Sequence, residues 1–141
     1  MGKTIVVIDA SAAQRRFLET LLALDHYTVV SFGSGLEALG YLQLFSADLI
    51  ITDIRVPQLD GIELCKTLKA EADLRNIPVV VLTALELAEL RDLLVPPVEA
   101  IVYKSAVGKG LRQMVKTLLE QTSLPPQTVQ PSLFAHLSSY F

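Results

Sequence analysis

Four short, mostly apolar runs in this chain each end at a polar or charged residue. The four residues are Asp9, Asp53, Thr83 and Lys104. Short runs rich in β-branched residues and bounded in this way predict buried strands of a parallel sheet. Parallel strands end along one edge of their sheet, and this carboxyl edge is where ligands bind in open α/β folds. We therefore expect the four polar side chains to lie close together.

The chemistry of these side chains suits a phosphoryl group and a divalent cation. Carboxylate oxygens, here those of Asp9 and Asp53, are ligands that Mg²⁺ prefers in proteins. The ammonium of Lys104 and the hydroxyl of Thr83 are suited to phosphate oxygens. Taken singly, each residue is explained better as a helix cap or an ordinary strand end. Their joint occurrence at the ends of strands favours one shared site.

Helical segments alternate with the strands along the chain. Strands are predicted over residues 4–8, 27–32, 49–52, 79–82 and 100–103. Helices are predicted over residues 11–24, 34–44, 60–70 and 106–121. A further helix is predicted to begin at the cap Thr83 and to end at Val95 at the latest. Residues that cap helix N-termini precede the first four helices, at Ser11, Ser34, Asp60 and Thr83.

This βα alternation predicts an α/β fold with a parallel sheet, right-handed crossovers and helices on both faces. The architecture that fits best is a flavodoxin-like (βα)5 three-layer sandwich with strand order 2-1-3-4-5. In this order the first and third strands are neighbours, so Asp9 lies beside Asp53.

The pattern ends after residue 121, so we expect one domain over residues 1–121 and a linker or tail over 122–141. Pro125, Pro126 and Pro131 stand among Ser, Thr and Gln, as is typical of linkers. Apolar residues then return on roughly one face of a short helix, at Leu133, Phe134, Leu137, Tyr140 and Phe141. This segment either frays as a loose tail or docks on an apolar surface of its own domain or of a second copy.

Composition excludes several classes of protein. With 141 residues the chain suits one domain. No apolar stretch approaches the ~20 residues that span a bilayer, and the N-terminal apolar run is too short for a signal peptide, so we expect a cytoplasmic protein. The net charge of −3 without a basic tract argues against direct nucleic-acid binding. The single cysteine, Cys65, rules out an internal disulfide and is expected to be a buried hydrophobe.

The four polar strand ends belong to a set of motifs that resembles the motifs of a known family. The motifs lie at residues 5–9, 14–16, 48–61, 80–84 and 103–104. The run from Asp53 to Gly61 has the form D-x-x-x-P-x-x-D-G, followed at the expected intervals by Thr83-Ala84 and Lys104. Over residues 3–121 the chain resembles the receiver domain of two-component response regulators.

This resemblance implies a role for each matched residue. Asp53 would be the phosphoacceptor, and Asp9, Asp53 and the backbone carbonyl of Arg55 would hold Mg²⁺. Thr83, Ala84 and Lys104 would form the switch and phosphate-binding set. The implied partners are a sensor histidine kinase or a phosphotransfer protein, and a second copy bound through the fourth helix, fifth strand, last helix or tail. Activity would be limited to self-phosphorylation from a donor and self-dephosphorylation.

Three positions depart from the family pattern. Ala10 stands where a second acid is usual, so magnesium binding is expected to be weak. Ile101 replaces an aromatic switch residue, which removes the usual ring rotation. Ser105 follows Lys104 where a cis proline is common, and we expect a trans bond because cis bonds to other residues are costly. The guanidinium of Arg55 either reaches the acidic pocket and compensates for a missing cation or is solvated.

Two other functions compete with a phosphorylated receiver. A pseudo-receiver, which binds partners without phosphorylation, is favoured by Ala10, Ile101 and Ser105. A flavodoxin-like cofactor protein or a phosphohydrolase is poorly supported. The first βα turn has no Gly-rich phosphate loop, and Asp53-Ile54-Arg55 lacks the second aspartate of an aspartyl-nucleophile hydrolase.

Overall fold

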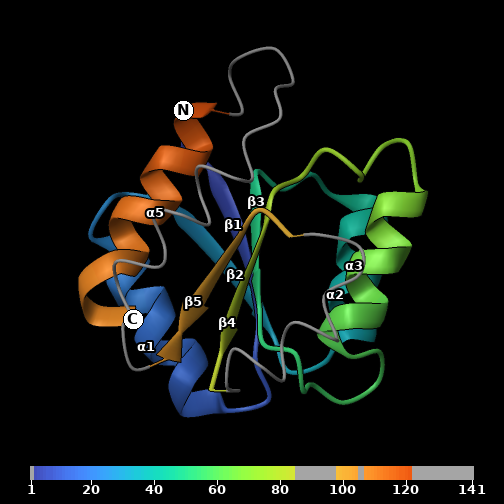
Figure 1. Cartoon of the computed structure of the whole chain (residues 1–141), viewed down its shortest axis with the longest axis horizontal. Helices are drawn as coiled ribbons and strands as arrows, with labels where there is room; N and C mark the ends of the chain where they lie inside the picture. Colours follow the sequence, from blue (N-terminus) through green and yellow to red (C-terminus); the bar gives the residue numbers. More distant parts are fainter. Residues whose placement is uncertain (1, 85–97, 105–106, 122–141) are drawn as a thin grey trace.

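Five parallel strands form a single sheet in the computed structural model, which describes residues 2–84, 98–104 and 107–121. The strands are β1 (Thr4–Ile8), β2 (Thr28–Phe32), β3 (Leu49–Thr52), β4 (Val79–Thr83) and β5 (Ala100–Tyr103). Their order is β2-β1-β3-β4-β5, which confirms the predicted order. Figure 1 shows this sheet nearly edge-on between the helices.

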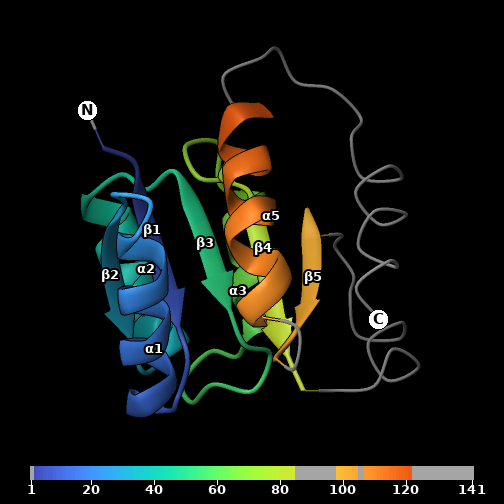
Figure 2. The ribbon, with the colours of Figure 1, turned by 90° about the vertical axis from the view of Figure 1, so that its left-hand side faces the viewer.

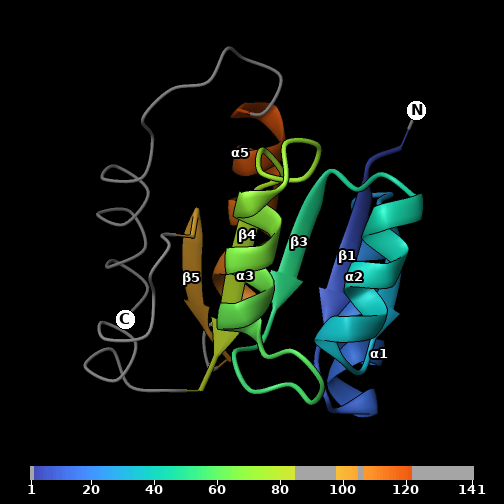
Figure 3. The same ribbon diagram turned by 90° about the vertical axis from the view of Figure 1, so that its right-hand side faces the viewer.

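Helices cover both faces of this sheet. The described helices are α1 (Ala12–Ala23), α2 (Gly35–Leu44), α3 (Gly61–Ala70) and α5 (Val107–Gln121). Helices α1 and α5 lie on one face (Figure 2), and α2 and α3 lie on the other (Figure 3). The flavodoxin-like three-layer sandwich is therefore confirmed.

The central strands are apolar on both faces because both faces are covered. Every residue of β3 and β4 is buried, whereas β2, at the edge of the sheet, is only partly buried. Burial on both faces explains why these strands read as continuous apolar runs without alternation. Helix α5 packs Leu111, Met114 and Leu118 into the same core.

The predicted helix starts at Ser11, Ser34 and Asp60 are confirmed. The Oγ atoms of Ser11 and Ser34 each accept a hydrogen bond of 3.2 Å from the backbone N–H three residues later. Asp60 Oδ1 accepts one of 2.9 Å from the N–H of Glu63. These bonds satisfy N–H groups that have no partner inside the helix.

Some boundaries differ from the predictions. Thr83 is the last residue of β4 and does not follow it, and Tyr27 precedes β2. The helical spacing of Phe17 with Leu18, Leu21 and Leu22 predicts that Phe17 lies on the apolar face of α1, but Phe17 is 45% exposed. Leu18 and Leu22, four residues apart, take the position facing the sheet, so Phe17 falls outside that face. The predicted fourth helix, Ser105 and the tail over 122–141 lie outside the described residues.

Cys65 is buried in α3, as predicted. Burial raises the pKa of its thiol to about 11, so the thiol stays protonated at neutral pH. It therefore acts as a small apolar side chain of the core.

Candidate functional site

Asp9 directly follows β1 and is almost completely buried, with 3% of its surface exposed. Its backbone N–H donates to the carbonyl of Phe32 on β2 at 3.1 Å. One carboxylate oxygen, Oδ1, accepts from the N–H of Ser11 at 2.9 Å, and the other, Oδ2, lies 3.2 Å from Lys104 Nζ. The Asp9 carboxylate is thus fixed between the start of α1 and a cation.

Asp53 follows β3 at the same level as Asp9, because Ile8 and Thr52 are paired in register. Its N–H donates to the carbonyl of Ile8 at 3.0 Å. Asp53 Oδ1 accepts from the N–H of Ile54 at 2.7 Å, and Oδ2 lies 2.7 Å from Lys104 Nζ. Its side chain is 16% exposed against 4% for Asp9, so Asp53 is the more accessible carboxylate.

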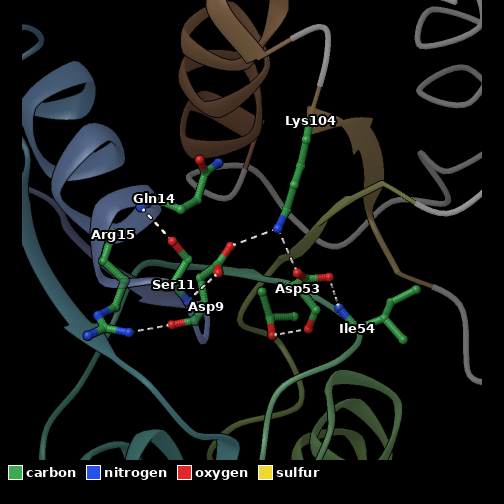
Figure 4. A network of polar contacts seen from close by, with 8 residues as sticks. Asp9, Ser11, Gln14, Arg15, Asp53, Ile54 and Lys104 are labelled. Carbon is green, nitrogen blue, oxygen red and sulfur yellow. Dashed lines mark hydrogen bonds and ion pairs between the residues drawn. The ribbon is translucent and has the colours of Figure 1, made fainter.

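Lys104 joins these two carboxylates from the end of β5 (Figure 4). Partial burial by itself lowers the pKa of Lys104. The hydrogen bond and charge of Asp53, followed by those of Asp9, outweigh this effect and raise the pKa overall. Lys104 is therefore a firmly protonated cation at neutral pH, and the predicted meeting of Asp9, Asp53 and Lys104 is borne out by the geometry.

Thr83 lies at the same edge of the sheet and is completely buried. It is in register with Tyr103, the residue before Lys104. Ala84 follows it and is exposed. Ile101 pairs with Val81 in the sheet and is 5% exposed, so the position of the family's aromatic switch holds a buried aliphatic side chain.

The two remaining expectations concern Ala10 and Arg55, and both side chains are exposed. Within the described residues Arg55 has no hydrogen bond or ion pair, so the solvated alternative holds and the pocket alternative is wrong. The arginine that touches the site is Arg15, whose Nη1 donates to the carbonyl of Asp9 at 2.6 Å. The sequence does carry a signal for Arg15. Arg15 lies one turn after Ser11, and because side chains on a helix lean toward the N-terminus of the helix, its guanidinium is directed toward the end of β1.

The start of α3 packs closely against Asp53. The N–H of Gly61 donates to the carbonyl of Ile54 at 2.8 Å. A Cβ atom at Gly61 would lie 2.5 Å from the backbone oxygen of Asp53, closer than van der Waals contact allows. Gly61 therefore permits the approach of α3 that sets the position of Asp53.

The donor set fits a hydrated magnesium ion. Asp9 and Asp53 direct oxygens toward one point, which Lys104 Nζ now contacts. Mg²⁺ is commonly bound by one or two carboxylates and keeps several of its waters. Among the described residues no group of three or more His, Cys, Asp and Glu side chains forms a fuller metal site. Within the described residues the site therefore offers such an ion the carboxylates of Asp9 and Asp53.

Comparison with known proteins identifies related chains. The response regulator receiver domain family matches residues 5–121. "Probable transcriptional regulator ycf27" of Cyanophora paradoxa is 36% identical over 124 residues, which cover 87% of this chain and 51% of that protein. "Polar-differentiation response regulator DivK" of Brucella ovis is 33% identical over 84 residues, covering 60% of this chain and 68% of that protein.

Solved structures give the same relationship. The signal receiver domain of a signal transduction histidine kinase from Syntrophus aciditrophicus has a TM-score of 0.82 and 31% identity, with 89% of this chain and 96% of that chain covered. The phosphorylated cyanobacterial phytochrome response regulator RcpA has a TM-score of 0.69 and 28% identity, with 90% and 98% covered.

The match does not extend over whole relatives. This chain spans 51%, 32% and 46% of the lengths of three relatives that share the name ycf27. In the part of the chain that the structure describes, every helix is too short or too polar to cross a membrane.

Proposed function

The chain belongs to the family of response regulator receiver domains of two-component signalling, and we propose that it accepts a phosphoryl group on Asp53. One observation carries this proposal: Asp53 Oδ2 lies 2.7 Å from Lys104 Nζ, and Asp9 Oδ2 lies 3.2 Å from the same nitrogen. A carboxylate nucleophile, a second carboxylate and a cation thus meet at one point. Such a domain is a signalling module and turns over no separate substrate.

In the transfer, an oxygen of Asp53 forms a bond to the phosphorus of the donor. The bond between phosphorus and the leaving atom breaks, and that atom keeps the electron pair. Lys104 pairs with Asp53 before transfer and with an oxygen of the acyl phosphate afterwards. Thr83 donates its hydroxyl to another phosphoryl oxygen and moves toward it, and this movement is the switch.

Asp9, Asp53 and the backbone carbonyl of Arg55 are proposed to hold Mg²⁺. When bound, the ion neutralises phosphoryl oxygens so that a negative nucleophile can approach. Ala10 supplies no carboxylate, so binding is weak. This weakness makes the charge of Lys104 more important to the transfer.

We propose a sensor histidine kinase or a phosphotransfer protein as the donor, because receiver domains interact with such proteins. The output surface includes β5, α5 and the segment that follows Ala84, and a second copy would bind there or through the tail. Since Ile101 has no ring to rotate, the movement of Thr83 is transmitted without the usual aromatic switch. Residues 1–121 are proposed as the receiver domain and 122–141 as a linker or tail.

Labelling with a small acyl phosphate such as acetyl phosphate tests the proposal. With excess Mg²⁺, the parent is expected to gain one phosphoryl group, detected by intact mass. Asp53→Asn is expected to gain none, because the amide is not a nucleophile here. Asp60→Asn is the matched control: Asp60 lies in the same loop, and Asn caps a helix as well as Asp does.

Two results would overturn the proposal. Labelling that persists in Asp53→Asn would place the acceptor elsewhere. A parent that stays unlabelled at high Mg²⁺ would favour the competing function, a pseudo-receiver that binds partners without phosphorylation, in line with Ala10, Ile101 and Ser105.

A further inference from the structure

A second cation lies at the site besides Lys104, and it contacts backbone. Arg15 is partly buried, and its Nη1 is 2.6 Å from the carbonyl oxygen of Asp9 (Figure 4). With this bond, every polar atom of Asp9 has a partner: its N–H, its carbonyl oxygen and both carboxylate oxygens. Arg15 supplies the partner of the carbonyl oxygen, and it lies on the other side of Asp9 from Lys104 (Figure 4).

Local packing fits the guanidinium into this place. Asp9 is tied to β2 by the bond from its N–H to Phe32, the residue before Gly33. A Cβ atom at Gly33 would lie 3.2 Å from Arg15 Nη1, which is tighter than ordinary contact. The absence of a side chain at Gly33 thus leaves the room in which Arg15 reaches Asp9.

We propose that Arg15 is a positioning residue that fixes the Asp9 peptide and thereby holds the Asp9 carboxylate in place for magnesium. The inference rests on the proposed function, because it concerns the same site. Because residue 10 is Ala, Asp9 is the one carboxylate beside Asp53 among the described residues, so a shift of the Asp9 peptide is not compensated by a neighbouring acid. Arg15 therefore matters more in this chain than it would beside a pair of acids.

Four variants separate this role from a general effect of charge. Arg15→Gln removes the guanidinium, and Arg15→Lys keeps a charge and a donor. Gly33→Ala keeps Arg15 but crowds Nη1, without a backbone penalty because the φ of Gly33 is not positive. Arg16→Gln is the matched control, since Arg16 is the exposed neighbour and its replacement changes the net charge equally.

Magnesium titration followed by calorimetry is the first measurement. Removing a group that hydrogen-bonds to a metal-ligating residue typically lowers metal affinity tenfold or more. Arg15→Gln is therefore expected to weaken magnesium binding about tenfold. Arg15→Lys and Gly33→Ala are expected to fall between this variant and the parent. Arg16→Gln is expected to stay within about twofold, because exposed charges are screened. Equal affinities in Arg15→Gln and Arg16→Gln would overturn the inference.

The amide resonance of Ala10 is the second measurement, made without metal. Ala10 shares its peptide bond with the carbonyl that Arg15 contacts, so its nitrogen shift reports that hydrogen bond. We expect a change in Arg15→Gln and none in Arg16→Gln. A role in folding alone would lower the melting temperature and leave the folded-state Ala10 resonance unmoved, which would overturn the inference.

The two proposals fail in different ways. An unlabelled parent contradicts phosphorylation of Asp53, while the metal-free Ala10 resonance still decides whether Arg15 positions Asp9. If the parent is labelled, but Arg15→Gln has the same Ala10 resonance and the same magnesium affinity as the parent, only the role of Arg15 is contradicted.

Discussion

At the scale of residues, Lys104 is the shared counter-charge of two carboxylates. Without it, Asp9 and Asp53 would lie close together at a mostly buried edge with no cation between them. Lys104→Met is therefore expected to destabilise the metal-free protein by about 1–3 kcal/mol at neutral pH. Urea unfolding measures this loss. Lys66→Met is the control, because Lys66 forms only an exposed pair with Glu63, and its loss should cost about 0.5 kcal/mol or less.

The pH dependence of this loss follows from the pKa of Lys104, which the two carboxylates raise. A group whose pKa is higher in the folded state stabilises that state fully below its unfolded pKa. The contribution disappears as pH rises through the folded pKa. The stability difference between parent and Lys104→Met should thus stay constant from neutral pH to about pH 9 and shrink above about pH 10. A difference that shrinks between pH 6 and pH 9 would contradict this account.

Ala10→Asp tests the reason given for weak magnesium binding. A second carboxylate beside Asp9 adds an oxygen ligand and negative charge, so magnesium affinity should rise. The same change should lower the melting temperature without metal, through repulsion between like charges. Calorimetric titration and thermal unfolding measure the two effects. An unchanged affinity would show that residue 10 does not face the site.

Only part of this site was predictable from sequence. Asp9, Asp53 and Lys104 were predictable because strand ends in a parallel sheet converge, whatever the loops do. Arg15 was not predicted. Its place one turn after Ser11 directs the side chain toward the start of the helix, but the sequence does not identify the backbone oxygen of Asp9 as its partner. Arg55 is two residues from Asp53, yet its side chain is exposed, so closeness in sequence was a poor guide there.

At the scale of elements, the junction of β3 and α3 carries the phosphoacceptor. Gly61→Ala would place Cβ 2.5 Å from the backbone oxygen of Asp53, so either α3 or Asp53 must shift. We expect a loss of about 1–3 kcal/mol and slower labelling by acetyl phosphate. Gly40→Ala is the matched control, because nothing lies within 4 Å of its added Cβ in the middle of α2.

The two variants should move stability in opposite directions. An alanine in place of an unhindered glycine inside a helix stabilises it by about 0.5–1 kcal/mol. Gly40→Ala should therefore raise the melting temperature and leave labelling unchanged. If Gly61→Ala matches it in both stability and labelling, α3 does not set the position of Asp53.

The elements themselves were largely predictable, because local signals agreed with the final packing. The caps at Ser11, Ser34 and Asp60 and the burial of β3 and β4 follow directly from residue type and pattern. The exposure of Phe17 was missed because helical spacing gives an apolar stripe but does not say which side of it meets the sheet.

At the scale of the whole molecule, the strand order determines the site. Only because β1 lies between β2 and β3 are Asp9 and Asp53 neighbours, and only because β5 lies beyond β4 does Lys104 reach both from across the sheet edge. Neither relation is local in sequence. The alternation of strands and helices predicts the parallel sheet and its right-handed crossovers, and the strand order then places Asp9 beside Asp53.

The tail prediction also belongs to this scale. Residues 122–141 lie outside the described residues, and their apolar side chains include Leu133, Phe134 and Tyr140. An exposed apolar patch is seldom left without a partner, so deletion after Thr122 is expected to lower the melting temperature or to convert a dimer to a monomer. Light scattering and thermal unfolding measure both. A truncated chain with the same oligomeric state and the same melting temperature as the full chain would contradict docking.

The central claim is that Asp53 carries the phosphoryl group. Borohydride reduces an aspartyl phosphate to homoserine, so reduction after labelling, followed by peptide mass spectrometry, identifies the acceptor directly. We expect homoserine at position 53 in the parent and at no position in Asp53→Asn. Homoserine at another aspartate such as Asp9 would contradict the account, as would its complete absence from a labelled and reduced parent.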